Sequence, residues 1–184
     1  MHRVRFGLVV LLASFALGAT AANGVRSPWG EPFSTRLVSS EGYQAKIFLP
    51  DSWSVDPDQH VLLPADASLS GCRIRFDTDQ SVGFQKGLAA GLRHDKESAD
   101  REFQSKLEHA GGAEAVWVRY IDRAGNRIAN MYVDWSSGQS ASFLVWQFEG
   151  PDNAAGYDCQ GTFGVSAQGS SIKPVETPGT ASPN

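Results

Sequence analysis

Beyond residue 22 the chain lacks any apolar run that approaches the about 20 residues needed to cross a bilayer. Its start differs. Two arginines precede an apolar run from Phe6 to Leu17, and Ala19 to Ala22 supply small residues for cleavage. This layout is typical of a secretory signal peptide over residues 1–22, and the run is short for a membrane anchor. We therefore expect a periplasmic or secreted protein with no membrane insertion after signal cleavage.

Basic residues are also few, because Lys and Arg number 16 against 20 Asp and Glu, a net charge of −4. Two of the 16 basic residues and none of the acidic ones lie in residues 1–22, so the remaining chain carries a net charge of −6. Nucleic acids and anionic membranes require clustered Lys and Arg, so neither is an expected partner. The negative charge permits a basic partner, and solubility alone also explains it.

Cysteine is scarce as well, since Cys72 and Cys159 are the only two. Their wide separation disfavours a zinc site, and the absence of a Cys-x-x-Cys pair argues against a redox motif. In an exported protein an even pair of cysteines is expected to be oxidised. We therefore predict a Cys72–Cys159 disulfide, worth about 4 kcal/mol on the chain-entropy model. Two free thiols are the alternative.

Composition divides the remaining chain into three parts. Residues 23–40 are rich in Gly, Pro and Ser and predict an extended N-terminal arm. Residues 168–184 have no periodicity and many turn formers, which predicts a disordered tail. A single globular domain is expected over residues 41–167, a normal length for one domain.

Apolar periodicity indicates the elements of this domain. Period-two alternation predicts strands over residues 43–49, 72–77 and 157–165, which places both cysteines on inward faces of strands. A helix is predicted from apolar residues at helical spacing, namely Ala99, Phe103, Leu107 and Ala110. Asp95 or Ser98 can start this helix, and Gly111-Gly112 can end it. Residues 84–92 are expected to form a turn or short helix. The predicted class is α+β, a mainly antiparallel twisted sheet with one or two helices packed on one face.

Residues 114–149 predict a three-stranded antiparallel meander. If both turns have four residues, Asp122 lies opposite Arg127 and Trp135 lies opposite Ser140. One face then collects the core residues Val116, Val118, Tyr120, Ala129, Met131, Val133, Leu144, Trp146 and Phe148. The other face holds an aromatic row of Trp117, Tyr132 and Phe143, with Arg119 and Asn130 beside it. The row is either covered by the arm or a loop, or it is an open binding surface.

The second turn of the meander carries a partial catalytic signature. Gly138-Gln139-Ser140 begins like a nucleophile elbow, but Ser142 replaces the final glycine and a strand-like segment follows instead of a helix. The sequence does not place His60, His94 or His109 near Ser140. We therefore expect a hairpin tip that binds through Trp135, Ser136, Ser137, Gly138, Gln139 and Ser140.

Other chemical motifs are missing or incomplete. The Asp77–Ser81 cluster starts like a calcium loop but lacks its glycine and its final glutamate in register, and turn formation explains both this cluster and Asp56–Asp58 better. No phosphate-binding glycine loop or dinucleotide fingerprint is present, so no metal or cofactor is expected. Arg73 and Arg75 on one strand face can bind an anion or simply face solvent.

Three motifs occur in a characteristic order: "FLPDSW" at residues 48–53, "CRIRFD" at 72–77, and "DRAGNR" at 122–127 after a helical region. Over residues 43–166 this order resembles the PsbP-like domains, the α/β/α fold of the photosystem II extrinsic subunit and of many small bacterial exported proteins. The last helix of that fold is not evident in the sequence. The resemblance implies a domain used for binding, not catalysis, and it transfers no functional residue.

These observations favour an exported non-catalytic binding protein that acts through protein contact. Its specific form is an inhibitor or immunity-type protein of an envelope-targeting enzyme, which presents the 136–140 hairpin to a cleft. The alternatives are an envelope hydrolase that uses Ser140, and a glycan or small-molecule binder that uses Trp117, Arg119, Asn130 and Tyr132.

Overall fold

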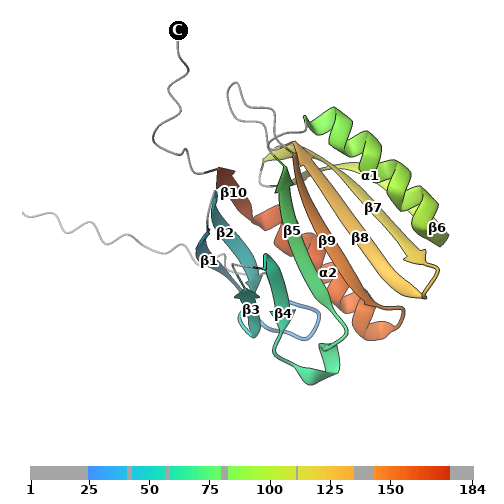
Figure 1. Ribbon diagram of the computed structural model, residues 1–184. Helices are drawn as coiled ribbons and strands as arrows, with labels where there is room; N and C mark the ends of the chain where they lie inside the picture. The colour runs from blue at the N-terminus through green and yellow to red at the C-terminus, as the bar shows by residue number, and fades with distance from the viewer. Residues whose placement is uncertain are drawn as a thin grey trace, which may run out of the picture.

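The computed structural model describes residues 25–40, 43–56, 59–79, 83–110, 112–134 and 143–174, which form two antiparallel sheets and two α-helices (Figure 1). The large sheet has the strand order β3-β4-β5-β9-β8-β7-β6. Its strands are β3 (Trp53–Asp56), β4 (Val61–Pro64), β5 (Arg73–Asp79), β6 (Ala99–Ala110), β7 (Ala113–Asp122), β8 (Asn126–Asp134) and β9 (Phe143–Pro151). The small sheet, ordered β1-β2-β10, comprises β1 (Phe33–Ser40), β2 (Tyr43–Pro50) and β10 (Ser171–Pro174). The predicted α+β class is confirmed.

The helices α1 (Phe84–Ser98) and α2 (Ala154–Gly169) pack on opposite faces of the large sheet (Figure 1). We call the face under α1 the front and the face under α2 the back. The back face, α2 and the small sheet enclose the main core. Its largest members are Tyr43, Trp53, Phe76, Trp146, Phe148 and Phe163. A second, smaller core lies under α1 and includes Phe84, Val116, Val118, Tyr120 and Tyr132.

The predicted disulfide between Cys72 and Cys159 is confirmed, with 6.3 Å between the two Cα atoms. The predicted strand at residues 157–165 is wrong, because these residues lie in α2. The side chain of Asn153 caps this helix by accepting a hydrogen bond from the Gly156 N–H at 3.1 Å. Its glycines allow a close approach to the sheet, since a Cβ at Gly164 would lie 3.0 Å from the Trp117 ring. Packing therefore overrides the weak helical propensity of a Gly-rich segment.

The predicted helix over residues 99–110 is also wrong, because these residues form the edge strand β6, while α1 occupies residues 84–98. The apolar spacing in residues 99–110 does not mark a buried stripe: Leu107 remains 75% exposed. Pairing with β7 satisfies the backbone of this mostly polar strand. Two register shifts and the positive φ of Glu102 (61°) interrupt its start. Such bulges and the charged side chains protect an exposed edge from pairing with other chains.

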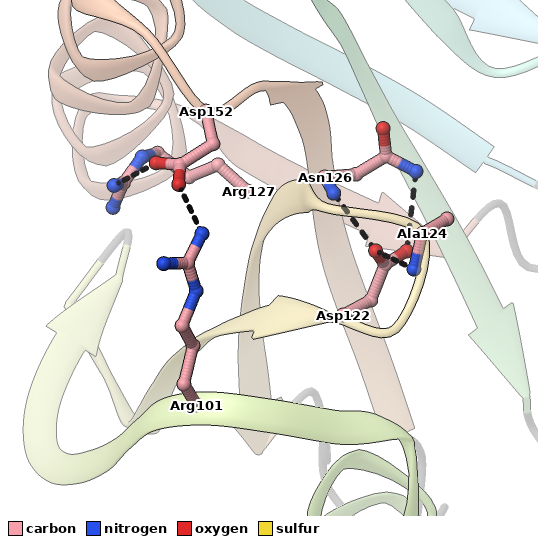
Figure 2. A network of polar contacts seen from close by, with 6 residues as sticks. All are labelled: Arg101, Asp122, Ala124, Asn126, Arg127 and Asp152. Carbon is pink, nitrogen blue, oxygen red and sulfur yellow. Dashed lines mark hydrogen bonds and ion pairs between the residues drawn. The ribbon is translucent and has the colours of Figure 1, made fainter.

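The first meander turn has three residues, not four, so Ile121 pairs with Arg127. The Asp122 carboxylate accepts hydrogen bonds from the Ala124 and Asn126 N–H groups at 2.9 and 2.8 Å (Figure 2). Gly125 takes the left-handed conformation, with φ of 84°, that this turn requires. Because the turn is one residue shorter than predicted, every side chain of β7 lies on the opposite face from the predicted one. Val116, Val118 and Tyr120 therefore share the front face with Asn130 and Tyr132.

The relative faces of β8 and β9 are as predicted. Asp134 pairs with Phe143, and Met131 pairs with Trp146 in the back core. The predicted pairing of Trp135 with Ser140 itself lies outside the described residues, but the register that it implied is wrong by two residues, because Tyr132 pairs with Val145 and not with Phe143.

Asp152 ties the start of β6 to β8 and to the start of α2. Its carboxylate accepts hydrogen bonds from Arg101 at 2.7 Å and from the buried Arg127 at 2.6 Å (Figure 2). The Arg127 guanidinium also lies over the Tyr157 ring, 3.5 Å from its centroid. The cluster links three elements of the fold, because both guanidinium groups share the one Asp152 carboxylate.

The ends of the chain take part in the fold more than the sequence suggested. Residues 33–40 of the predicted arm form β1, and the buried ring of Phe33 packs against Phe48, 5.1 Å between centroids. Residues 168–174, expected in a disordered tail, complete α2 and form β10, which pairs with β2. The predicted signal peptide at residues 1–22 and residues 175–184 lie outside the described residues.

We expect a Cys72→Ser/Cys159→Ser variant to lose about 4 kcal/mol of unfolding free energy, because the disulfide closes an 87-residue separation in the unfolded chain. Urea unfolding followed by Trp fluorescence measures this loss. Reducing agent should lower the stability of the wild type to that of the variant and leave the variant unchanged. A variant as stable as the oxidised wild type would contradict the prediction.

Candidate functional site

The front face is covered by α1 at one side of the large sheet and open at the other. On β5 the side chains alternate, with Ile74 and Phe76 buried in the back core and Arg73 and Arg75 exposed on the front. In Figure 1, α1 lies beside β7 and β8, whereas no helix covers β4 and β5 on this side. The strand register then sets the neighbours: Arg75 pairs with Gln147, and Gln147 pairs with Asn130.

A hollow of about 170 Å³ lies where the open part of this face meets α1. We call it the front hollow. Polar side chains from four elements dominate its lining: Arg73 and Arg75 of β5, His94 and Asp95 of α1, Asn130 and Tyr132 of β8, and Gln147 and Glu149 of β9. Tyr120, Ile128 and Phe148 complete the lining.

The position of α1 follows from its sequence. Phe84, Leu88 and Leu92 are spaced by four residues and pack on the front core. Gly91 lets the helix approach the sheet, because a Cβ there would lie 2.5 Å from the Tyr132 ring. One turn further along the same side, the helix presents Asp95 to the sheet instead of another apolar residue.

Asp95 is 0% exposed and accepts three hydrogen bonds from the sheet. The Tyr132 hydroxyl donates to Oδ2 at 2.6 Å, and the Tyr120 hydroxyl and the Asn130 amide donate to Oδ1 at 3.2 and 2.7 Å. All three donors are themselves buried. A buried carboxylate is costly unless its oxygens are satisfied, and here they are. Asp95 therefore fixes α1 on the sheet.

Burial raises the pKa of Asp95 above its ordinary value of 3.8. The hydrogen bonds from Tyr132, Tyr120 and Asn130 and the charge of His94 lower this pKa, but burial is the largest effect. Burial and the neighbouring Asp95 carboxylate also raise the pKa of both tyrosines far above the usual value of 10.0. The tyrosines therefore remain hydrogen-bond donors at every physiological pH, and neither is an activated base.

The charges at the mouth of the hollow are unequally paired. Arg73 donates to the Glu149 carboxylate from Nε at 3.1 Å and from a terminal nitrogen at 2.5 Å, which neutralises both groups. Within the described ranges, Arg75 and His94 have no hydrogen-bonded or ion-paired acceptor. The hollow can therefore accept an anion through Arg75, with the Gln147 amide beside it.

The structure does not bring the predicted aromatic row together. Trp117 and Arg119 lie on the back side of β7, whereas Asn130 and Tyr132 are buried on the front. Trp117 packs against Phe163 with 5.1 Å between ring centroids. Phe143 belongs to β9, but its side chain and the hairpin tip Trp135–Ser140 lie outside the described residues.

Trp117 and Arg119 do line a second hollow of about 180 Å³ beside β6. The Lys106 ammonium covers the Trp117 ring, 5.8 Å from its centroid. Arg119 donates two hydrogen bonds to Gln104 Oε1, at 3.0 and 2.7 Å. Both side chains are thus engaged by β6, which leaves little of the Trp117 ring face for a ligand.

From the sequence, Tyr120 was expected only on the core face of the meander, and Asp95 only as one of two possible starts of a helix. One signal was available. Phe84, Leu88 and Leu92 form an apolar series, and a charged residue three positions later continues the same side of a helix. The exposed pair Arg73 and Arg75 was recognised correctly from the alternation of β5.

Within the described part of the chain, no three His, Cys, Asp or Glu side chains gather as metal ligands, and no helix is both long and apolar enough to span a membrane. The three histidines outside residues 1–22 belong to different regions: His60 stacks on Phe76, His94 lies in α1, and His109 lies in β6.

No protein-family model and no curated protein matches the chain. Among solved structures it is similar to LpqN, involved in cell envelope biogenesis of Mycobacterium tuberculosis, with 15% identity and a TM-score of 0.57 over 77% of this chain and 92% of that one. It is also similar to cyanobacterial PsbP (CyanoP) from Synechocystis sp. PCC 6803, with 12% identity and a TM-score of 0.50 over 85% of this chain and 98% of that one. The PsbP-like fold predicted from the sequence is thus confirmed. At these identities the likeness extends to the fold alone.

We expect Asp95→Ala to lower the free energy of unfolding by about 3 kcal/mol or more, since each buried donor left without an acceptor costs about 1–3 kcal/mol. Asp95→Asn keeps one acceptor oxygen and should cost less. The exposed Glu97 of the same helix is the matched control, and Glu97→Ala should change stability by less than about 0.5 kcal/mol. Urea unfolding measures all three, and an Asp95→Ala variant as stable as the control would contradict the role of Asp95.

Asp95 should also give stability an unusual pH dependence. Because its pKa is raised on folding, the folded protein takes up a proton at pH values above the ordinary 3.8, and its stabilising contribution falls as pH rises through the raised pKa. The free energy of unfolding of the wild type minus that of Asp95→Asn should therefore decrease from about pH 4 upward. Urea unfolding at stepped pH measures this difference. An increase with pH would mean that the hydrogen bonds outweigh burial.

Proposed function

We propose that this protein is an exported, non-catalytic binding protein that acts through protein contact, with the front hollow at the centre of the contact surface. The sequence of residues 1–22 and the Cys72–Cys159 disulfide support export. Both similar structures fit this setting, since one is of a protein involved in cell envelope biogenesis and the other is a PsbP. The observation that carries the proposal is an open polar surface beside α1 that includes Arg75, which has no hydrogen-bonded or ion-paired acceptor among the described residues.

The size of the front hollow favours a protein partner. Sites for small molecules usually enclose about 300–1,000 Å³, whereas the front hollow measures about 170 Å³. A volume of this size accommodates one side chain, and a central pocket that receives one side chain is typical of the energetic centre of a protein interface. The surrounding exposed strands β4 and β5 would form the rest of the contact area.

The chemistry of the hollow favours binding over catalysis. Its one carboxylate away from the Arg73–Glu149 pair is Asp95, whose oxygens are occupied by three donors and shielded from solvent. The tyrosines are held in their protonated form by their raised pKa. A general base needs access to a substrate proton, and Asp95 has none in this arrangement.

The specific form we propose is an inhibitor or immunity-type protein of an envelope-targeting enzyme. The hairpin predicted from the sequence at Trp135–Ser140 follows β8 in the chain, and Asn130 of β8 lines the front hollow. The four residue steps from Asn130 to Asp134 span about 13 Å at about 3.3 Å per step. One interface of ordinary size, about 800 Å² on each partner, can include both the hollow and the hairpin.

Two alternatives have direct tests. For the hydrolase hypothesis, esterase and peptidoglycan assays compare the wild type with Ser140→Ala, and activity lost in the variant would replace our proposal. For the glycan hypothesis, ligand-induced changes in Trp fluorescence should vanish in Trp117→Ala. The engagement of Trp117 by Lys106 and Phe163 disfavours this second alternative.

We expect a photo-crosslinking amino acid at Asp77, an exposed front position of β5, to capture a discrete protein from the envelope fraction of the source. The same group at Lys173, exposed on β10 of the small sheet, is the matched control and should capture little. Mass spectrometry identifies the adducts. Equal capture from both positions, or none from Asp77, would count against the front face as the contact surface.

A further inference from the structure

We infer that the front hollow is a subsite for a single carboxylate, the side chain of an Asp or Glu on the partner protein, with Arg75 as its ligand and Gln147 and His94 beside it. This inference rests on the proposed function, since it names the chemistry of the group that the contact surface receives. It concerns residues that the sequence alone left as an anion site or a solvated strand face.

The first support is the imbalance of charge between two neighbouring arginines. Arg73 and Arg75 lie two residues apart on β5 and point to the same face. Glu149, directly across from Arg73 on β9, neutralises it with two hydrogen bonds. Gln147 stands at the corresponding position across from Arg75, so this arginine has an uncharged neighbour. An exposed guanidinium at a hollow, without an acceptor among the described residues, is a ready site for an anion.

The second support is the set of donors around Arg75. The register places Arg75, Gln147 and Asn130 in one row across β5, β9 and β8. Adjacent strands lie about 4.8 Å apart, so the Gln147 amide is within reach of a group held by Arg75. His94 lines the hollow from α1 and has no hydrogen-bonded partner among the described side chains. A carboxylate needs only a few donors of this kind, and guanidinium matches its planar shape.

The third support is the electrostatic state of Asp95 beneath the site. An ionised carboxylate there would repel an incoming one. Asp95 is instead screened by Tyr120, Asn130 and Tyr132, which donate to it from the sheet, and burial raises its pKa. Both effects weaken the negative potential at the floor of the hollow.

The same inventory disfavours phosphate. A phosphate group carries up to two charges and is usually held by several arginines or backbone donors. Here one of the two arginines is already neutralised by Glu149, so a dianion would have Arg75 as its one arginine. The volume of about 170 Å³ is also suited to one side chain.

The test is an NMR titration of the isotope-labelled protein with three probes: N-acetyl-glutamate α-methylamide, its uncharged glutamine analogue, and inorganic phosphate. We expect the glutamate probe to give saturable shifts of the Arg75 Nε–H and the Gln147 side-chain amide, and the glutamine analogue to give none. Arg75→Gln should weaken glutamate binding at least about tenfold, the effect of about 1.4 kcal/mol. Arg93→Gln, an exposed arginine of α1 outside the hollow, is the matched control and should leave binding unchanged.

Three results would overturn the inference: equal shifts from the glutamine analogue, tighter binding of phosphate at the same residues, or an equal loss in Arg93→Gln. The proposed function has an independent readout, the crosslink from Asp77. A crosslinked partner whose capture is unchanged in Arg75→Gln would overturn the carboxylate subsite and leave protein contact intact. Binding of the glutamate probe without any crosslinked partner would overturn protein contact and leave the carboxylate site intact.

Discussion

The three-residue turn between Asp122 and Asn126 is the constraint on which the rest of the site depends. A side chain changes face with every residue of a strand, so one additional turn residue would move all of β7 to the wrong side. The Asp122 carboxylate and the left-handed Gly125 specify the shorter turn. As a result Tyr120 arrives on the same face as Asn130 and Tyr132, and three donors converge on one carboxylate.

That convergence determines how α1 is held. The helix presents a mostly apolar side to the front core, and its single buried charge, Asp95, meets donors from β7 and β8 only. A polar anchor of this kind is more directional than apolar packing, because displacement of the helix by one turn would leave the donors and the carboxylate unsatisfied. The helix is therefore fixed above β7 and β8, and the hollow beside it keeps a defined shape.

The sequence predicted what depends on local alternation and composition. The α+β class, the disulfide, the PsbP-like fold, the exposed pair Arg73 and Arg75 on β5 and the faces of β8 and β9 were all recovered. These features follow from side chains that alternate in regular strands, and from the chemistry expected of a cysteine pair in a chain with a predicted signal peptide.

The failures have a common physical origin in tertiary contacts. The apolar alternation of residues 157–165 resembles a strand, and close packing on the sheet, with Cys159, Phe163 and Ala167 buried in the main core, favours the helix. Residues 99–110 have helical spacing, yet as an edge strand β6 gains its stability from pairing with β7 and leaves Leu107 exposed. The network around Asp95 could not be assembled, because it requires the correct position of α1 and the correct turn length together.

The open part of the front face is a consequence of geometry. Seven strands at about 4.8 Å spacing make a face nearly 30 Å wide, whereas one helix with its side chains is about 10 Å across. A single α1 therefore covers only two or three strands, and β5, which it leaves open, carries the polar side chains of Arg73 and Arg75 on this side. Solubility requires polar groups there, but it is satisfied equally by neutralised pairs such as Arg73 and Glu149. An arginine without an ion-paired acceptor among the described residues, beside the front hollow, is more than solubility requires, and for this reason Arg75 marks the part of the surface where recognition is expected.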